Sequence, residues 1–398
     1  MNSNDYIAIE DRYGAHNYHP LDVVIEKGNG VWVWDVDGKK YMDCLAAYSA
    51  VNQGHCHPRL IKVMQGQAEK LTLTSRAFRN NLWPLFAQKV CEILGFEKVL
   101  PMNSGAEAVE TAIKIARKWG YKIKKVEKDK AEIIVCKGNF HGRTTTIVSF
   151  SDDPSAAENY GPYTPGFKQI PFGDANALED AVTSNTVAFL VEPIQGEAGV
   201  VVPPDGFLRQ AAEICQKNNV LLIADEIQSG LGRTGKMLAC EHENVKPDMI
   251  TIGKALSGGF YPVSAVLADA RVMDVIEPGT HGSTYGGNPL AAAIAIEALS
   301  ILQEEKLCDN AAKLGAYLLE RLQALKSPYI DFVRGKGLWI GIVLKPGEKN
   351  ARSFCQQLKA EGILAKDTHE HIIRLAPPLV ITREEIDWVI DRVAKVLS

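Results

Sequence analysis

The stretch from Val220 to Gly259 constrains the fold most, because it holds two short apolar runs that each end close to a charged residue. Val220–Ala224 and Met249–Ile252 are rich in branched residues and are bounded by polar or turn residues, which is typical of buried parallel strands. Asp225 follows the first run directly, and Lys254 follows the second after one glycine. Since parallel strands bring their carboxyl ends to one edge of a sheet, we expect this acid and this lysine to face one crevice.

The length and the charge of the chain exclude several classes of protein. A chain of 398 residues is too long for one minimal core, which favours two domains. The net charge of −4 gives no reason to expect nucleic acid or an anionic membrane as a partner. No apolar run approaches the ~20 residues that span a bilayer, and the acidic start lacks the pattern of a signal or transit peptide. The eight cysteines form no C-x-x-C pair, as expected of reduced thiols in a cytoplasmic protein.

Strand-like and helix-like segments alternate through the middle of the chain, which predicts an α/β fold with a parallel sheet covered on both faces. Further strands are expected at Val99–Met102, Glu132–Cys136, Val187–Val191 and Val263–Leu267, and helices at Pro58–Thr72, Leu82–Leu94 and Phe207–Lys217. Residues 1–57 are predicted to hold turns and short strands, with a hairpin over residues 31–42. Residues 154–171, rich in Pro, Gly and Tyr, are predicted to be loop.

The pattern changes after about residue 305. Helices are expected at Ala311–Leu325, Ala351–Glu361 and Thr382–Leu397, around a strand at Leu338–Val343, as in a smaller α+β domain. The spacing of Thr382 and Glu385 is that of a capping box. We therefore predict an N-terminal segment (1–57) that is part of the small domain, a large domain (58–304) and a C-terminal small domain (305–398).

Other patterns suggest chemistry that fits less well. Residues 230–236 come close to a phosphate loop, but Met237 takes the place of the magnesium-binding hydroxyl and the segment follows the acid strand. His55-Cys56-His57, and the pair His369 and His371, lack the spacing of a closed metal site. Local packing or capping is the better interpretation there, and no metal is predicted.

The residues alone leave the role of the lysine open. Lys254 could be a solvated strand end and Asp225 part of a turn, or the pair could hold a cofactor. Ser104 begins a helix, and Gly105 behind it lets a ligand approach the free backbone amides, although most such helix starts are only caps.

Nine motifs lie between GAHNYHPL, which starts at Gly14, and RLAPPLVI, which ends at Ile381, so that together they cover nearly the whole chain. They are SAVNQGHCHP, LTLTSRAF, KVLPMNSGAEA, GNFHGRT, VEPIQGEAGVVVP, LLIADEIQSGLGRTG, GKALSGG, HGSTYGGNPL and IIRLAPP. With them the chain resembles the class III (fold type I) pyridoxal-phosphate aminotransferases, in particular the branch that acts on ornithine. The resemblance implies a large domain with a mostly parallel seven-stranded sheet covered by helices, and a smaller α+β domain built from both chain ends.

The resemblance also implies that Lys254 bonds covalently to pyridoxal 5′-phosphate and later moves protons as a general acid and base. Asp225 would pair with the pyridine nitrogen and keep it protonated. The other cofactor-binding residues would be Gly105 and Ala106 at the phosphate, Phe140 on the ring face, Gln228 at the ring hydroxyl, and Ser283 and Thr284 from the neighbouring subunit of a homodimer, which could assemble further. His141 stands where some family members carry Trp, and we expect it to alter the packing on the cofactor face without loss of function.

The substrates implied by the resemblance are L-ornithine and 2-oxoglutarate. Tyr18 and Arg143 would hold the α-carboxylate of ornithine, and Tyr48 would shape the pocket. Arg374 would bind the carboxylate of 2-oxoglutarate next to the reacting carbon, with Glu197 masking it while ornithine is bound, and Glu192 would also contact substrate. The alternatives are another ω-aminotransferase of the class, acting on acetylornithine, 4-aminobutyrate or lysine, a nucleotide hydrolase, and a binding protein on an inactive transferase scaffold.

Overall fold

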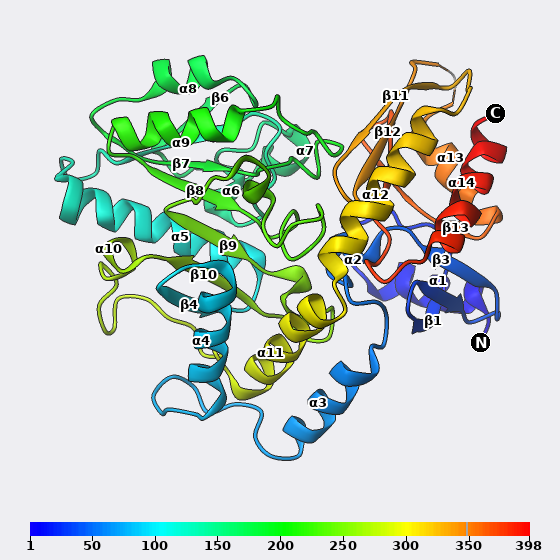
Figure 1. Cartoon of the computed structure of the whole chain (residues 1–398), viewed down its shortest axis with the longest axis horizontal. Coiled ribbons are helices and arrows are strands. Elements are labelled where there is room, and N and C mark those ends of the chain that lie inside the picture. The colour runs from blue at the N-terminus through cyan, green and yellow to red at the C-terminus, as the bar shows by residue number, and fades with distance from the viewer. Residues whose placement is uncertain (348) are drawn as a thin grey trace.

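The computed structural model describes residues 1–347 and 349–398, and within them the chain forms a large α/β lobe and a smaller lobe (Figure 1). The large lobe is built on a seven-stranded sheet in the order β4-β10-β9-β8-β7-β5-β6. Its strands are β4 (Lys98–Met102), β5 (Glu132–Cys136), β6 (Phe167–Ile170), β7 (Thr186–Val191), β8 (Leu221–Asp225), β9 (Met249–Ile252) and β10 (Ser264–Ala268). The predicted positions of β4, β5 and β7–β10 are confirmed to within one residue at either end.

The central strands are buried on both faces because their side chains alternate between two cores. Leu222 and Ala224 of β8 belong to one core, whereas Leu221 and Ile223 belong to the other. Helix α5 (Gly105–Trp119) covers one face, and α9 (Phe207–Lys217) and α11 (Pro289–Glu304) contribute to the core on the opposite face. Burial on two faces explains why these strands appear in the sequence as continuous apolar runs.

One strand departs from the expected parallel arrangement. β10 pairs antiparallel with both β4 and β9, while the other neighbouring strands of the sheet run parallel. Only residues 253–263 separate β9 from β10, which is fewer than the dozen or more that a crossover between parallel strands needs. The expectation of a wholly parallel sheet is therefore wrong for β10, and the mostly parallel sheet implied by the resemblance is confirmed.

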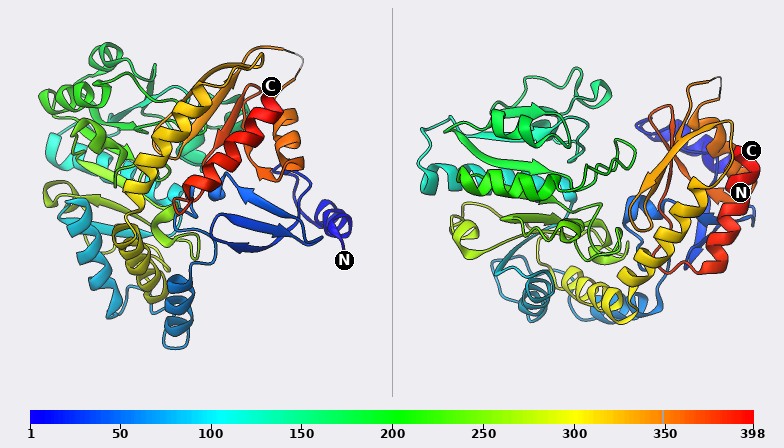
Figure 2. Two further views of the ribbon diagram at one scale, coloured as in Figure 1. Left: turned by 45° about the vertical axis from the view of Figure 1, so that its right-hand side comes forward. Right: turned by 45° about the horizontal axis from the view of Figure 1, so that its top comes forward.

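The smaller lobe combines both ends of the chain (Figure 2). Its first sheet, β1-β2-β3-β13, pairs β13 (Ile363–Leu364) in parallel with β3 (Lys40–Asp43). The predicted hairpin is β2 (Trp32–Asp35) and β3, and β1 (Ile25–Asn29) precedes it. The second sheet, β11-β12-β15-β14, consists of β11 (Ile330–Gly335), β12 (Ile340–Leu344), β14 (Lys366–Thr368) and β15 (Ile372–Leu375). The domain boundaries at residues 57 and 304 stay a prediction.

The remaining helices cover these sheets or join the lobes. They include α3 (Pro58–Ala68), α4 (Leu82–Leu94), α12 (Leu307–Gln323), α13 (Ala351–Ala360) and α14 (Arg383–Leu397). The capping box of α14 is confirmed, because Thr382 accepts from the amide of Glu385 and the Glu385 side chain accepts from the amide of Thr382. No helix within the described residues is both long enough and apolar enough to cross a membrane.

Several elements were not predicted, and four of them lie in segments for which turns, strands or loop were expected or directly after such a segment. Helix α1 (Ser3–Tyr13) lies in the segment expected to hold only turns and strands, and its signal is the capping box formed by Asn2 and Asp5. The expected loop 154–171 contains α7 (Pro154–Ala157) and β6, which is an edge strand too short to show alternation. Helix α8 (Ala175–Ala181) follows β6 and was also missed.

Helix α12 approaches the large lobe so closely that backbone packs on backbone. A Cβ atom added at Gly315 would lie less than 3.0 Å from the backbone of Gly337. Gly337 has a φ of +58°, and a Cβ there would lie less than 3.0 Å from the backbone of Thr234. No side chain therefore fits at Gly315 or Gly337 without moving α12 or the loop at residue 234.

Gly315→Ala should destabilise the protein, although helix propensity alone favours alanine over glycine. In a helix interior this substitution ordinarily stabilises by about 1 kcal/mol, but here overpacking against Gly337 should lower the free energy of unfolding by about 2 kcal/mol. Urea unfolding measures the difference. Ala316→Gly, at an exposed position of the same helix, is the matched control and should cost about 1 kcal/mol through propensity alone. A more stable Gly315→Ala variant would contradict the close packing.

Candidate active site

The acid and the lysine of the opening stretch meet at one edge of the large sheet. Asp225 ends β8 and lies opposite Thr251 of β9, whose hydroxyl donates to Asp225 Oδ1 at 3.0 Å. The amide of Ile227 donates to the same oxygen at 3.1 Å. Lys254 begins a short 3-10 turn after β9 with a φ of +46° and lines the same cavity as Asp225. The predicted juxtaposition is confirmed, and Thr251 is a supporting residue that the sequence reasoning missed.

His141 is bonded to the other oxygen of that carboxylate. Its Nδ1 lies 2.6 Å from Asp225 Oδ2, and both side chains are buried. Burial alone would lower the pKa of His141, but the hydrogen bond to Asp225 and the charge of Asp225 outweigh it and raise the pKa. The sequence placed His141 only on the cofactor face, whereas the structure also places it behind the acid, where it holds the carboxylate and partly balances its charge.

The start of α5 supplies the predicted anion site beside this pair. The Ser104 hydroxyl accepts from the amide of Glu107, and Glu107 accepts in return from the amide of Ser104 at 2.7 Å. Gly105 and Ala106 then stand in the first helical turn, where amides have no acceptor within the helix. Both line the cavity that contains Asp225 and Lys254. The helix start therefore points donor groups and the positive end of its dipole at that cavity.

Two connected cavities make up the site. The inner one has a volume of about 200 Å³ and is lined by Asp225, Gln228 and the start of α5, among others. The outer one has a volume of about 770 Å³ and contains Tyr18, Tyr48, Arg143 and Glu197 in its wall. They meet at residues that line both, namely Phe140, His141, Gly142 and Lys254. A ligand in the inner cavity would thus present its reactive end to substrates that enter through the outer one.

A buried arginine of the smaller lobe is bonded to two residues that line the outer cavity, Glu197 and Thr368. Arg374 Nη1 donates to Glu197 Oε1 at 2.9 Å and to the hydroxyl of Thr368 at 3.3 Å, while the guanidinium carbon lies 5.5 Å from the centre of the Tyr48 ring. Although burial opposes it, the charge of Arg374 lowers the pKa of Glu197, so the pair is ionised. Among the described residues, Nε and Nη2 of Arg374 have no hydrogen-bond partner, which leaves a planar pair of donors for a carboxylate.

Tyr48 stands on a strained turn. Helix α2 (Ala46–Ser49) is a single left-handed turn in which four successive non-glycine residues have φ between +48° and +69°. Left-handed backbone costs an L-residue roughly 1–2 kcal/mol. The Asp43 carboxylate holds the start of the turn by accepting from the amides of Leu45 and Ala46. Strain of this kind persists only where the surrounding structure fixes it, and it is found at functional sites.

Glu192 faces the inner cavity. Its Oε2 accepts from the amide of Phe140 at 2.9 Å, and its Oε1 accepts from the amide of Gly196 at 3.4 Å. Burial is the main cause that raises the pKa of Glu192 to about 7, against the opposing charge of His141. The carboxyl group thus ties the ring-stacking segment at Phe140 to the loop that carries Glu197. The structure places Glu192 beneath the site, while Tyr18 and Arg143 stand exposed at its mouth.

Three predicted residues line neither cavity, namely Arg374, Ser283 and Thr284. Ser283 accepts from the amide group of Asn103 at 2.8 Å, and neither Ser283 nor Thr284 contributes to the inner or the outer wall. The loop is held through His281, which lies 2.8 Å from both Thr111 Oγ1 and Lys114 Nζ on α5. The contribution of Ser283 and Thr284 to the site of a neighbouring subunit stays a prediction.

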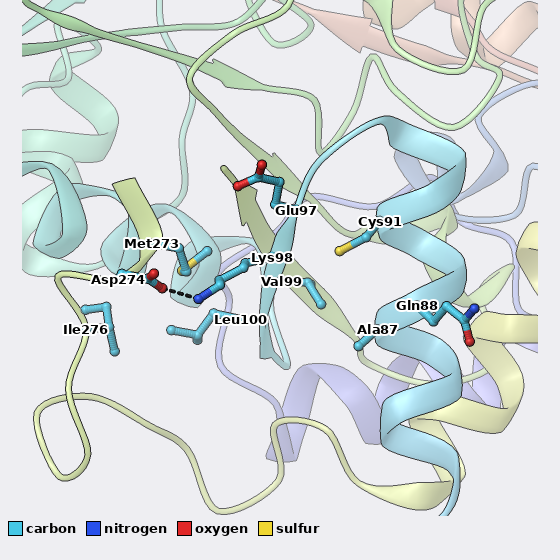
Figure 3. Close-up of a pocket in the computed structure, with 10 residues that line it drawn as sticks. All are labelled: Ala87, Gln88, Cys91, Glu97, Lys98, Val99, Leu100, Met273, Asp274 and Ile276. Carbon is cyan, nitrogen blue, oxygen red and sulfur yellow. Dashed lines mark hydrogen bonds and ion pairs between the residues drawn. The ribbon is translucent and has the colours of Figure 1, made fainter. Parts of the chain in front are cut away.

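The competing motifs have structural roles. Residues 230–236, which resemble a phosphate loop, are mostly buried against the smaller lobe and line neither cavity. His57 caps α3 by accepting from the amide of Arg59, and His55 lies 2.7 Å from Asp43, as local packing or capping predicted. A further hollow of about 470 Å³ lies between α4 and β4, where Lys98 and Asp274 form an ion pair (Figure 3).

Comparisons with known proteins agree with this geometry. Residues 13–397 match the family model described as Aminotransferase class-III. The ornithine aminotransferase of Brevibacillus brevis is 55% identical over 395 residues, which cover 99% of this chain and 98% of that protein. The solved ornithine aminotransferase of Toxoplasma gondii ME49 has a TM-score of 0.98 at 47% identity, with 100% of this chain and 95% of that chain covered. The acetylornithine aminotransferase of Elizabethkingia anophelis has a TM-score of 0.92 at 52% identity, with 100% and 99% covered.

Likeness over this length defines the class: the fold is that of the pyridoxal-phosphate-dependent transferases. Within that class the chain belongs to the class-III aminotransferases. The donor set of the inner cavity fits this cofactor, because the amides at the start of α5 suit a phosphate, the Asp225 carboxylate suits a protonated ring nitrogen and the Lys254 amine suits an aldehyde.

The raised pKa of Glu192 predicts how stability depends on pH. The unfolded carboxyl releases its proton near its ordinary pKa of 4.5, whereas the folded one keeps it until about pH 7. Between these values the folded state binds more protons, so this group makes the wild type less stable as pH rises. In cofactor-loaded protein, Glu192→Gln should gain on the wild type from pH 5 to 7 and no further above, as measured by urea unfolding. The exposed control Glu158→Gln should show no such trend, and a pH-independent difference for Glu192→Gln would contradict the assignment.

Proposed function

We propose that this protein is a δ-aminotransferase that moves the terminal amine of L-ornithine to 2-oxoglutarate, giving L-glutamate 5-semialdehyde and L-glutamate. The observation that carries the proposal is the ion pair of the buried Arg374 with Glu197, which lines the outer cavity. A free arginine beside Lys254 would bind the α-carboxylate of any amino acid and direct its α-amine to the reaction. With the arginine masked, a terminal amine is the better donor, and a dicarboxylate acceptor can use Arg374 once Glu197 releases it.

The residues at the mouth suit the other end of ornithine. Arg143 is exposed, lies with its guanidinium carbon 5.6 Å from the centre of the Phe140 ring, and shares the outer cavity with Tyr18. A planar guanidinium and a phenol hydroxyl can together bind an α-carboxylate. Ornithine held there extends its δ-amine inward toward Lys254. The same arginine would bind the distal carboxylate of 2-oxoglutarate.

Pyridoxal phosphate, when bound, supplies an electron sink for the carbanion formed at the substrate carbon. Burial lowers the pKa of Lys254 more than the carboxylates of Asp225, Glu197 and Glu192 raise it. A less basic amine is more readily unprotonated, so Lys254 Nζ can accept a proton from the substrate carbon and return it. The Asp225 carboxylate, fixed by His141 and Thr251, can hold a proton on the ring nitrogen. Gln228 lines the inner cavity and donates weakly to Glu197 at 3.5 Å, and in the loaded enzyme it would contact the ring hydroxyl of the cofactor.

The proposal includes a homodimer with shared active sites. Ser283 and Thr284 present hydroxyls that the protomer's own cavities do not use. Tyr285 beside them and Phe78 are exposed, and Asn80 donates to the carbonyl of Gly287, so both segments belong to one surface. In the dimer, this surface would meet a second copy and carry the two hydroxyls to the phosphate end of its site.

A substrate comparison tests the function. Steady-state assays of the cofactor-loaded enzyme with 2-oxoglutarate should give the highest kcat/KM for ornithine, well above those for N-acetylornithine and 4-aminobutyrate. A preference for acetylornithine would favour the activity of the 52%-identical relative from Elizabethkingia anophelis. The absence of turnover with all three donors would favour a binding protein on an inactive scaffold.

Glu197→Ala should relax the choice between the two amines. Without the mask, Arg374 is free to bind the α-carboxylate of glutamate or ornithine, so α-amino transfer should increase at least about tenfold relative to δ-transfer, equivalent to about 1.4 kcal/mol. The products of each transfer can be separated and quantified. Glu158→Gln, on an exposed surface, is the control and should keep the wild-type ratio. An unchanged ratio in Glu197→Ala would refute the mask.

A further inference from the structure

The phosphate-loop-like segment holds a buried arginine that the reaction does not use. Arg233 is fully buried, and its Nη1 donates to the carbonyl oxygens of Leu338 at 2.8 Å and Pro377 at 2.7 Å. Its Nη2 donates to Asn52 Oδ1 at 2.5 Å. The amide of Leu338 donates back to the carbonyl of Arg233 at 3.2 Å. Arg233, a side chain of the large lobe, therefore binds backbone carbonyls of the smaller lobe just before β12 and just after β15.

The cation has only neutral partners in the described part of the chain. Its hydrogen-bond acceptors are two backbone carbonyls and one amide oxygen, and its Nε has no partner there. Burial accordingly lowers the pKa of Arg233 to about 9. The charge of Asp43 opposes this effect only in part, and desolvating a guanidinium without a directly bonded counter-ion is costly. A hydrophobic side chain would fill this volume at lower cost, so the hydrogen bonds themselves must matter.

The next two links lead to the reactive lysine. Asn52, which accepts from Arg233, also donates to the carbonyl of Leu231 at 2.9 Å. Its neighbour Gln53 donates to the carbonyls of Ala255 at 3.1 Å and Ala298 at 3.2 Å. Ala255 directly follows Lys254 in the short turn after β9. Asn52 and Gln53 are both buried, so water does not compete for these bonds.

These hydrogen bonds therefore connect the segment that follows Arg374 with the turn of Lys254. Pro377 lies three residues after Arg374, and the amide of Ala376 between them donates to the carbonyl of Cys44 at 2.6 Å. At the other end is the turn of Lys254. We propose that Arg233, Asn52 and Gln53 are positioning residues that fix the distance between the carboxylate-binding Arg374 and the reactive amine of Lys254, and that they thereby set the enzyme's selectivity for its 2-oxo acid.

The two halves of the reaction depend on that distance differently, an argument that rests on the proposed function. A 2-oxo acid bound at Arg374 has its carboxylate on the carbon next to the reacting one, so an error in spacing misplaces the reacting carbon directly. Ornithine is held by its far end, and its three methylenes can absorb a small shift. A misplacement of about 1 Å can cost up to about 100-fold in rate, so the acceptor half should be the sensitive one.

Arg233→Lys and Gln53→Met test the proposal in the cofactor-loaded enzyme. The lysine keeps the charge but cannot reach three acceptors in the fork geometry of arginine, and the methionine removes two hydrogen bonds at nearly equal volume. Each half-reaction is followed separately by the cofactor's absorbance in single turnovers. We expect the rate constant of the 2-oxoglutarate half-reaction to fall at least about tenfold, while that of the ornithine half-reaction changes less than about twofold.

Lys124→Met is the matched control. Lys124 also donates to two backbone carbonyls, those of Thr186 and Asn218, but on a part of the large lobe that touches neither substrate group. It should lower stability without changing the ratio of the two half-reactions. Asn52→Asp, which keeps an acceptor for Arg233, should lie between wild type and Arg233→Lys, and it carries the test if Arg233→Lys does not fold.

The outcomes separate this inference from the proposed function. Equal losses in both half-reactions, or none in either, would overturn the positioning role, because a merely structural defect lowers both alike. A wild-type enzyme that does not accept ornithine would instead refute the proposed function. In that case the acceptor half-reaction of the amino-loaded enzyme still reports whether Gln53→Met lowers its rate constant with 2-oxoglutarate.

Discussion

The pairing of β8 with β9 is the constraint on which the site depends. The parallel register sets Asp225 opposite Thr251, so that the hydroxyl of Thr251 fixes the carboxylate. Lys254 begins the turn after β9, three residues beyond Thr251. A slip of one residue would turn Asp225 into one of the apolar cores. Because both strands are buried on two faces, hydrophobic packing fixes this register. The same packing therefore fixes the positions of Asp225 and Lys254.

The second lobe completes what the sheet begins. Arg374 belongs to β15 and bonds to Glu197 of the large lobe, next to the close packing of loop 230–235, residues 336–339 and α12. Gly315 and Gly337 allow that close packing because they have no side chain. Arg233 joins the two lobes by hydrogen bonds. In the proposed function, substrate choice depends on the interface between lobes, where Glu197 of the large lobe pairs with the buried Arg374 of the smaller one.

Much of this architecture was predictable from the sequence, because strand ends obey a rule of topology. The apolar runs located β8 and β9, and the rule about carboxyl ends brought Asp225 and Lys254 together. The bond between His141 and Asp225 joins residues 84 positions apart, and Arg233 reaches Pro377 over 144 positions, so no local pattern reports either contact. The left-handed turn at Tyr48 was hidden for another reason, since alanine and tyrosine have no propensity for it.

The central claim is that Lys254 is the group that bonds to the cofactor beside Asp225. Reduction of the holoenzyme with borohydride, followed by digestion and mass spectrometry, tests this most directly. The visible absorbance should disappear, and the reduced pyridoxyl group should be found on the peptide that contains Lys254. Finding the group on another lysine, or recovering all of the cofactor unattached after reduction, would contradict the account.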